Sequence, residues 1–88
     1  MCVVYTDRVK HPDSRVTDAG KVVMGDGATI GMHPHDNDSE TYTVLSGRVM
    51  SNGVVYGPGD TMVCKKGEMH DCINLADGES VLRFVKRK

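Results

Sequence analysis

The sequence predicts an all-β fold, a small antiparallel sandwich or barrel built from short strands. Runs rich in Val, Thr, Ile and Tyr recur along the chain, and glycines and prolines separate them every few residues. Such runs between turn residues are typical of strands in sandwiches and barrels. No segment shows the apolar stripe of an amphipathic helix. The predicted strands cover residues 3–6, 21–24, 28–33, 42–45, 48–50, 54–56, 61–64, 71–75 and 80–85.

Turn residues set the limits of several of these strands. Pro34 ends the strand 28–33, because proline in a strand is confined to edges, ends and bulges. Asn52-Gly53 joins the strands 48–50 and 54–56 as a hairpin, since a type I′ turn needs positive φ at both central residues. Residues 57–60, Gly-Pro-Gly-Asp, turn the chain into the next strand, and Asp77-Gly78 predicts a second hairpin before the last one.

Length and composition indicate one domain spanning residues 1–88, with one modest core. The formal net charge is −1, and a nearly balanced charge gives no attraction to nucleic acid or to a membrane surface. The C-terminal Lys86-Arg87-Lys88 is basic but short, and we expect it to be a solvated tail.

The three cysteines and the N-terminus favour a cytoplasmic protein. Cys2, Cys64 and Cys72 have no CxxC spacing, which fits reduced thiols better than a disulfide framework. No apolar run is long enough to span a membrane, and no signal-peptide pattern is visible at the N-terminus.

Three of the four histidines and one glutamate form a candidate metal site. His33 and His35 are two residues apart on a predicted strand, so both side chains point to the same face. The turn-prone residues 36–39 let the chain reverse, and Glu40 then opens the next strand. His70 begins the strand 71–75 from its own glycine-rich segment. Three imidazoles and one carboxylate can hold a first-row divalent metal and leave positions open for substrate. The alternative is a buried hydrogen-bond network without metal. In that case the buried Glu40 carboxylate would carry a large desolvation cost.

Two spaced motifs resemble those of the cupin family. The pattern G(X)5HXH(X)3-4E(X)6G is similar to Gly27, His33, His35, Glu40 and Gly47. The pattern G(X)5PXG(X)2H(X)3N is similar to Gly59, Gly67, His70 and Asn74, with Lys65 where the family usually has proline. The two motifs and the hairpin between them cover residues 27–74, more than half of the chain.

The resemblance implies a jelly-roll barrel of two packed antiparallel sheets. It also implies that His33, His35, Glu40 and His70 bind one divalent transition metal, which could be Mn, Fe, Ni, Co, Cu or Zn. Small single-domain cupins commonly pair as homodimers, and short strands with open edges favour dimerisation on physical grounds too. A homodimer is therefore expected.

The residues leave the reaction open. Tyr42 and Cys72 share a face with predicted ligands and are the candidate catalytic residues; their alternative roles are barrel packing for Tyr42 and a small buried hydrophobe for Cys72. Asn74 is expected to tie down a loop. The first hypothesis is a metal-dependent enzyme acting on a small oxygen-bearing metabolite, of dioxygenase, isomerase or decarboxylase type. The second is a non-catalytic metallated module that binds or senses a small ligand.

Overall fold

The computed structural model describes residues 1–7, 10–34 and 38–88, and the side chains of His33 and Pro34 lie outside this description. The described residues form nine strands and no helix. The strands are β1 (Cys2–Thr6), β2 (Val16–Met24), β3 (Thr29–Pro34), β4 (Ser39–Ser46), β5 (Val49–Ser51), β6 (Val54–Tyr56), β7 (Thr61–Cys64), β8 (Met69–Asn74) and β9 (Ser80–Arg87).

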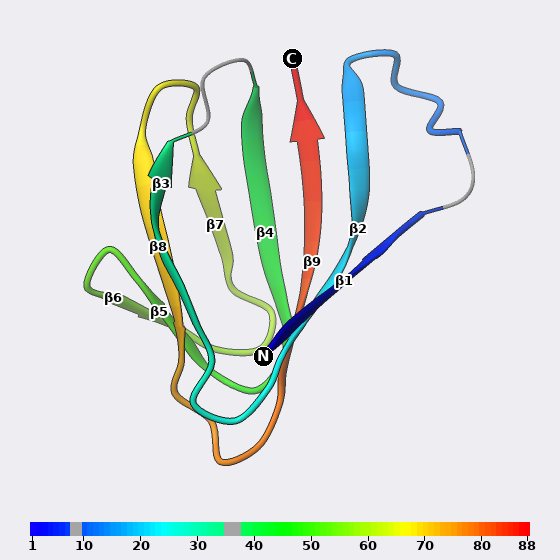
Figure 1. Ribbon diagram of the computed structural model, residues 1–88. Coiled ribbons are helices and arrows are strands. Elements are labelled where there is room, and N and C mark those ends of the chain that lie inside the picture. Colours follow the sequence, from blue (N-terminus) through cyan, green and yellow to red (C-terminus); the bar gives the residue numbers. More distant parts are fainter. Residues whose placement is uncertain (8–9, 35–37) are drawn as a thin grey trace.

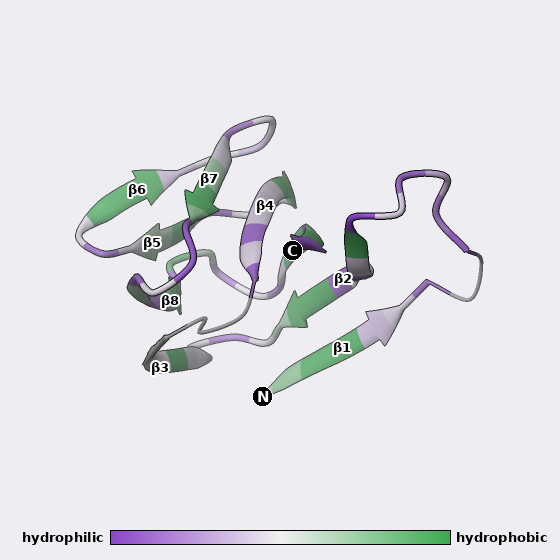
Figure 2. Ribbon diagram, turned by 90° about the horizontal axis from the view of Figure 1, so that it is seen from above, coloured by the Kyte–Doolittle hydropathy of each residue, from purple (hydrophilic) through white to green (hydrophobic). Residues whose placement is uncertain are grey.

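The strands build two antiparallel sheets that face each other (Figures 1 and 2). The five-stranded sheet has the order β1-β2-β9-β4-β7, and the four-stranded sheet has the order β3-β8-β5-β6. The chain crosses between the sheets after β2, β3, β4, β6, β7 and β8. The predicted all-β jelly roll of two packed sheets is confirmed.

The hairpin predicted at Asn52-Gly53 is present. Asn52 has φ 49° and Gly53 has φ 81°, and β5 pairs with β6 on either side of them. Both central residues therefore adopt the left-handed conformation that this two-residue turn requires.

The second predicted hairpin, at Asp77-Gly78, is wrong. These residues do reverse the chain, but β8 lies in the four-stranded sheet and β9 in the five-stranded sheet. The turn thus joins two layers, because β9 finds its partners in β2 and β4 rather than in β8.

The predicted solvated tail at residues 86–88 is also wrong in part. β9 runs to Arg87, and Lys86 pairs in register with Glu40 of β4 and Asp18 of β2. β2 is longer than predicted for the same reason, since residues 16–20 pair with β9 although Asp and Gly are depleted in strands. Pairing with neighbouring strands overrides local preference at both places.

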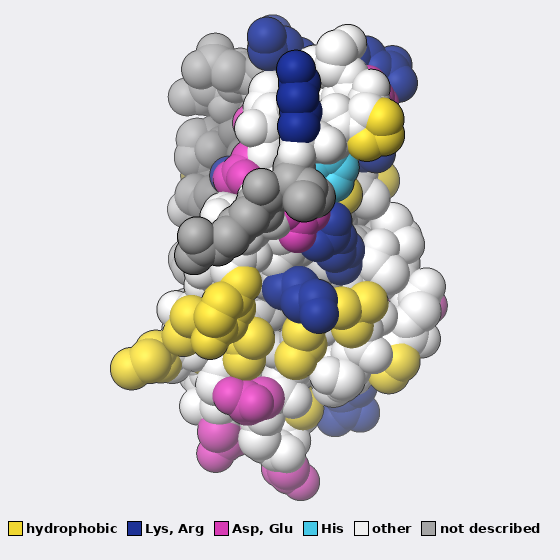
Figure 3. Space-filling view, turned by 90° about the vertical axis from the view of Figure 1, so that its right-hand side faces the viewer, with side chains coloured by type: hydrophobic (Ala, Val, Ile, Leu, Met, Phe, Trp, Pro, Cys, Tyr) yellow, Lys and Arg dark blue, Asp and Glu magenta, His cyan; other side chains and the backbone are white. Residues whose placement is uncertain are grey.

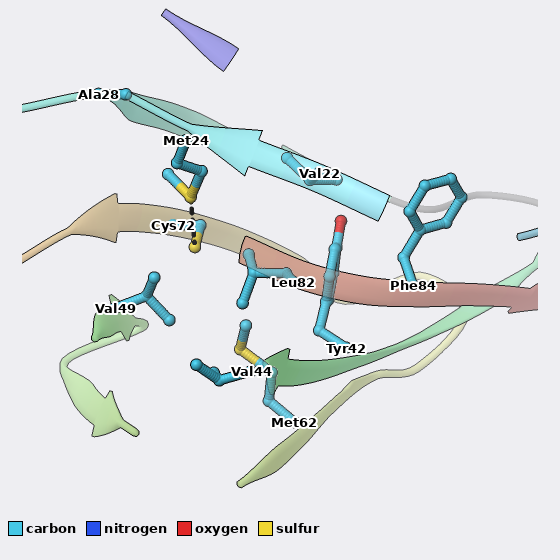
Figure 4. Close-up of a cluster of buried hydrophobic side chains, with 10 residues drawn as sticks. All are labelled: Val22, Met24, Ala28, Tyr42, Val44, Val49, Met62, Cys72, Leu82 and Phe84. Carbon is cyan, nitrogen blue, oxygen red and sulfur yellow. Dashed lines mark hydrogen bonds between the residues drawn. The ribbon is translucent and has the colours of Figure 1, made fainter. Parts of the chain in front are cut away.

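The core lies between the two sheets (Figure 4). Alternate residues of β4 and β9 point into it, as the period of a strand requires. Its fully buried side chains include Met24, Val44, Val49 and Leu82. Tyr42 pairs in register with Phe84 of β9 and Met62 of β7, and these three side chains extend the core toward Glu40.

One buried amide holds the end of the barrel opposite Glu40. The Asn74 side-chain nitrogen lies 2.7 Å from the carbonyl of Gly25 and 2.8 Å from that of Gly78, and donates to both. Its oxygen accepts from the Ser80 hydroxyl at 2.6 Å, and Ser80 Oγ in turn accepts from the Arg48 N–H. Asn74 thereby ties the ends of β2, β8 and β9 to the turn before β5, which agrees with its expected role.

Gly47 makes this packing possible. Its φ is +86°, and a Cβ at this position would lie 2.1 Å from Ser80 Oγ and 2.7 Å from Ser80 Cα. Both the backbone conformation and the available space therefore demand glycine.

Substituting Gly47 by alanine should destabilise the fold more than the matched change at Gly59. Gly59→Ala meets the same unfavourable φ, +88°, but no atom within 4 Å, so we expect a loss of about 1–2 kcal/mol. Gly47→Ala adds the clash with Ser80 and should lose about 3 kcal/mol or more. Urea unfolding of the two variants measures this difference, and equal losses would contradict the packing described for Gly47.

Candidate metal centre

Glu40 is a buried carboxylate on the inner face of β4. Burial alternates along the strand, so Glu40, Tyr42 and Val44 face the core and are 3%, 8% and 1% exposed. The Tyr42 hydroxyl donates to Glu40 Oε1 at 2.5 Å. Glu40 is therefore held in place by a neighbour on its own strand, as the predicted alternation allows.

His70 comes from the opposite sheet and meets Glu40. It is 5% exposed near the start of β8, and its Nε2 lies 3.9 Å from Glu40 Oε1. Its ring centroid is 5.6 Å from that of Tyr42, with the ring planes tilted by 42°. Two donor atoms bound to one ion at about 2.1 Å each can be up to about 4.2 Å apart. The pair thus fits joint binding of one divalent ion.

The backbone brings a second predicted ligand beside His70. In the pairing of β3 with β8, His33 lies directly opposite His70, after a register shift between Ile30 and His33. The side chain of His33 and the whole of His35 lie outside the described residues. Within the described part of the chain, no group of three His, Cys, Asp or Glu side chains could hold a metal ion. Glu40 and His70 are the members of the predicted set whose side chains are described.

Tyr42 is placed to donate a proton in a hydrogen bond. Burial is the main cause that raises the pKa of Tyr42 far above its usual range, and the hydrogen bond to Glu40 adds to it. The phenol therefore stays protonated at neutral pH and orients the Glu40 carboxylate.

Cys72 has the surroundings of a core thiol. It is 4% exposed, and its Sγ lies 3.6 Å from Met24 Sδ (Figure 4). Burial, followed by the charge of Asp71, raises the pKa of Cys72 to about 11. The thiol is neutral at pH 7, and these contacts match the packing alternative for this residue.

Two cavities flank Tyr42. The larger, about 240 Å³, lies beside Glu40 and is lined by Cys2, Val4, Asp18, Val22, Ile30, Glu40, Tyr42, Phe84 and Lys86. The smaller, about 90 Å³, lies beside His70, between β7 and the β5–β6 hairpin. The candidate centre thus has space next to it for a small molecule.

Asp18 and Lys86 line the larger cavity, although local sequence patterns predicted neither of them beside Glu40. Lys86 was assigned to the tail, although it continues the alternation of the buried Leu82 and Phe84 along β9. That alternation was the available signal. Asp18 gave no such signal, because it precedes the run predicted as strand.

The cupin domain family matches residues 20–85. The chain belongs to this family. The predicted family is thereby confirmed by a match that covers most of the sequence.

Solved cupin structures share the fold at low sequence identity. The chain is similar to the cupin domain of Schizosaccharomyces pombe Cnp3, with 15% identity, a TM-score of 0.80, and coverage of 99% of this chain and 64% of that one. It is similar to a predicted oxalate decarboxylase from Thermotoga maritima, with 21% identity, a TM-score of 0.78, and coverage of 96% and 79%. It is also similar to the Cupin_2 domain of an XRE family transcriptional regulator from Enterobacter cloacae, with 14% identity, a TM-score of 0.79, and coverage of 99% and 96%.

The chain spans less than two thirds of the length of the first of these structures. At identities this low, the three likenesses show the fold alone. No curated protein matches the sequence. The described residues contain no apolar helix of membrane-spanning length.

Proposed function

We propose that the chain binds one divalent transition metal through His33, His35, Glu40 and His70 and acts on a small oxygen-bearing metabolite. The observation that carries the proposal is the buried contact of His70 Nε2 with Glu40 Oε1, at 3.9 Å and beside a cavity of about 240 Å³. The register of His33 opposite His70 supports the wider set. When bound, the metal would supply a Lewis acid that polarises an oxygen atom of the ligand.

The chain's own residues would prepare the centre. Tyr42 donates to Glu40 and fixes the direction of its carboxylate, the kind of outer contact that orients metal ligands. Phe84, Val22 and Ile30 give the larger cavity an apolar wall that limits water beside Glu40. Tyr42 is hydrogen-bonded to Glu40 and Cys72 lies against Met24, so we assign orientation to Tyr42 and packing to Cys72.

A second function, a non-catalytic module that binds a small ligand, is favoured by one observation. The two candidate catalytic side chains are both engaged: Tyr42 with Glu40 and Cys72 with Met24. Such a centre can hold a ligand without converting it. The similar domain from Enterobacter cloacae belongs to a transcriptional regulator, which supports this alternative.

The proposal includes a homodimer formed through β1. This strand lies at the edge of its sheet, and Val4 and Tyr5 are 58% and 60% exposed. Figure 3 shows hydrophobic side chains gathered on the side of the molecule that β1 and β2 form. An exposed apolar edge is a ready template for pairing with a second copy.

Purified protein should carry about one transition metal per chain, and His70→Ala should remove it. Loss of a direct ligand should weaken metal binding by about 100-fold or more. Mutating a residue that only contacts a metal ligand already lowers metal affinity by about 10–100-fold. The measurement is elemental analysis after reconstitution with Mn, Fe and Zn. His11→Ala is the matched control, because His11 bonds to Asp7 away from the centre and should leave the metal in place. Protein that takes up no metal, or His70→Ala protein that keeps it, contradicts the proposal.

Turnover separates the enzyme from the module. Oxygen uptake and a panel of small oxygen-bearing metabolites should be assayed on Fe- and Mn-loaded protein, with His70→Ala as the control. Turnover by the unmodified protein that is lost in the His70→Ala variant supports the enzyme hypothesis. Saturable binding of a metabolite without conversion supports the module instead.

Sedimentation velocity tests the dimer. The unmodified chain should sediment with twice the mass of one copy, and Tyr5→Asp should shift it toward the monomer because a charge then lies on the pairing edge. A monomer at all concentrations, or a dimer that Tyr5→Asp leaves intact, would refute pairing through β1.

A further inference from the structure

A row of charged side chains crosses the inner face of the five-stranded sheet at one end of the barrel. Lys86 of β9 pairs in register with Asp18 of β2 on one side and with Glu40 of β4 on the other. All three residues line the larger cavity. The row therefore places one cation and two carboxylates around the space beside the proposed metal centre.

Lys86 faces this cavity rather than the outer surface. It follows Leu82 and Phe84 at intervals of two along β9, and these residues are 0% and 2% exposed on the inner face. The Lys86 ammonium lies 5.9 Å from the centroid of the Phe84 ring, close enough for an attraction between cation and ring. The ammonium thus lies near Phe84, which lines the same cavity as Lys86.

The charge of Lys86 is available to a ligand. Among the described residues, no carboxylate forms an ion pair with it. Asp18 accepts a hydrogen bond from the Ala19 N–H at 2.9 Å. Glu40 accepts from Tyr42 and lies near His70. Both neighbouring carboxylates therefore have other partners.

The rest of the cavity wall is mostly apolar. Val4, Val22, Ile30 and Phe84 come from four different strands and surround the space. Its volume of about 240 Å³ is below the usual range for drug-sized ligands, about 300–1,000 Å³. Such a space suits a small molecule with one polar end and a short hydrocarbon body.

We infer that Lys86 is a specificity-determining residue that selects small carboxylates with a short apolar body. The ammonium binds the carboxylate, and the hydrocarbon body lies on Val22, Ile30 and Phe84. The inference rests on the proposed function, because it names the class of ligand that would lie beside Glu40. A charge-assisted hydrogen bond is among the stronger polar contacts in a binding site, so one lysine can decide this preference.

The test compares ligands of one shape and different charge. The full-length, isotope-labelled chain is titrated at neutral pH with isovalerate, with the neutral isovaleramide and with isopentylamine, and amide chemical shifts are followed by NMR. Wild-type protein should bind isovalerate about fivefold or more tightly than isovaleramide. Lys86→Met should remove that difference, and Lys86→Arg should keep it.

Matched variants control for charge and for folding. Lys21→Met removes the same charge from an exposed residue of β2 and should leave isovalerate binding unchanged. Lys86→Gln replaces Lys86→Met if the latter does not give a folded spectrum. Asp18→Asn should keep or strengthen isovalerate binding, since it removes a nearby negative charge.

The outcomes are decisive for Lys86 in either direction. The inference is overturned if wild type shows no preference for isovalerate over isovaleramide, if Lys86→Met binds isovalerate as wild type does, or if isopentylamine binds most tightly. Each titration is run on chelator-treated and on zinc-loaded protein. A preference that depends on Lys86 in the chelator-treated chain, together with no metal uptake, would uphold the carboxylate site while the metal proposal fails. Metal uptake with no effect of Lys86→Met on isovalerate binding would support the metal proposal and overturn the role of Lys86.

Discussion

The Asn74 amide is the contact on which the arrangement of the two sheets most depends. It donates to carbonyls at the end of β2 and in the turn before β9, and it accepts from Ser80 at the start of β9. The backbone N–H of Asn74 donates to the carbonyl of Ala28, just before β3. A buried side-chain amide has several polar atoms that each need a hydrogen-bond partner. A network that supplies all of these partners holds the segments that it joins in one arrangement. Asn74 thus joins the end of β8 to the ends of β2 and β9 through its side chain, and to the segment before β3 through its backbone N–H.

This constraint reaches the candidate centre through the strands themselves. Asn74 and His70 lie on the same face of β8, four residues apart, with the core thiol of Cys72 between them. Glu40 and Val44 have the same spacing on β4 in the other sheet. β8 is fixed at its Asn74 end, and β4 pairs with β7 and β9 along its length. At the opposite end of the barrel, His70 Nε2 and Glu40 Oε1 lie 3.9 Å apart. A rigid scaffold of this kind is what a preorganised site requires.

Local sequence predicted the strands better than the way they connect. The limits of β6 and β7 follow from Gly, Pro and Asn residues on either side, and the Asn52-Gly53 turn follows from its own φ requirement. The crossing at Asp77-Gly78 was not predictable locally, because the same turn residues serve a hairpin and a connection between sheets. The position of Lys86 was missed because its strand continues only through pairing with β2 and β4. The sequence motifs predicted that Glu40 and His70 lie together, and they lie 3.9 Å apart. The cavity wall that contains Asp18 and Lys86 was not predictable locally, because its residues come from strands far apart in sequence.

β1 forms one wall of the larger cavity from the edge of its sheet. Cys2 and Val4 line that cavity, and among the described strands of one copy β1 pairs only with β2. Beyond the end of β1, two hydrogen bonds from Arg83 to Asp7 tie the chain to β9. In a single copy of the chain, such an edge strand opens at lower free energy than a central strand, and pairing with a second copy would raise that free energy. Detachment of β1 would expose the apolar wall without disturbing β4 or β8, which carry Glu40 and His70. Ligand entry and local unfolding would then be one motion, and the exchange rate of the β1 amide hydrogens would report how often the cavity admits a molecule.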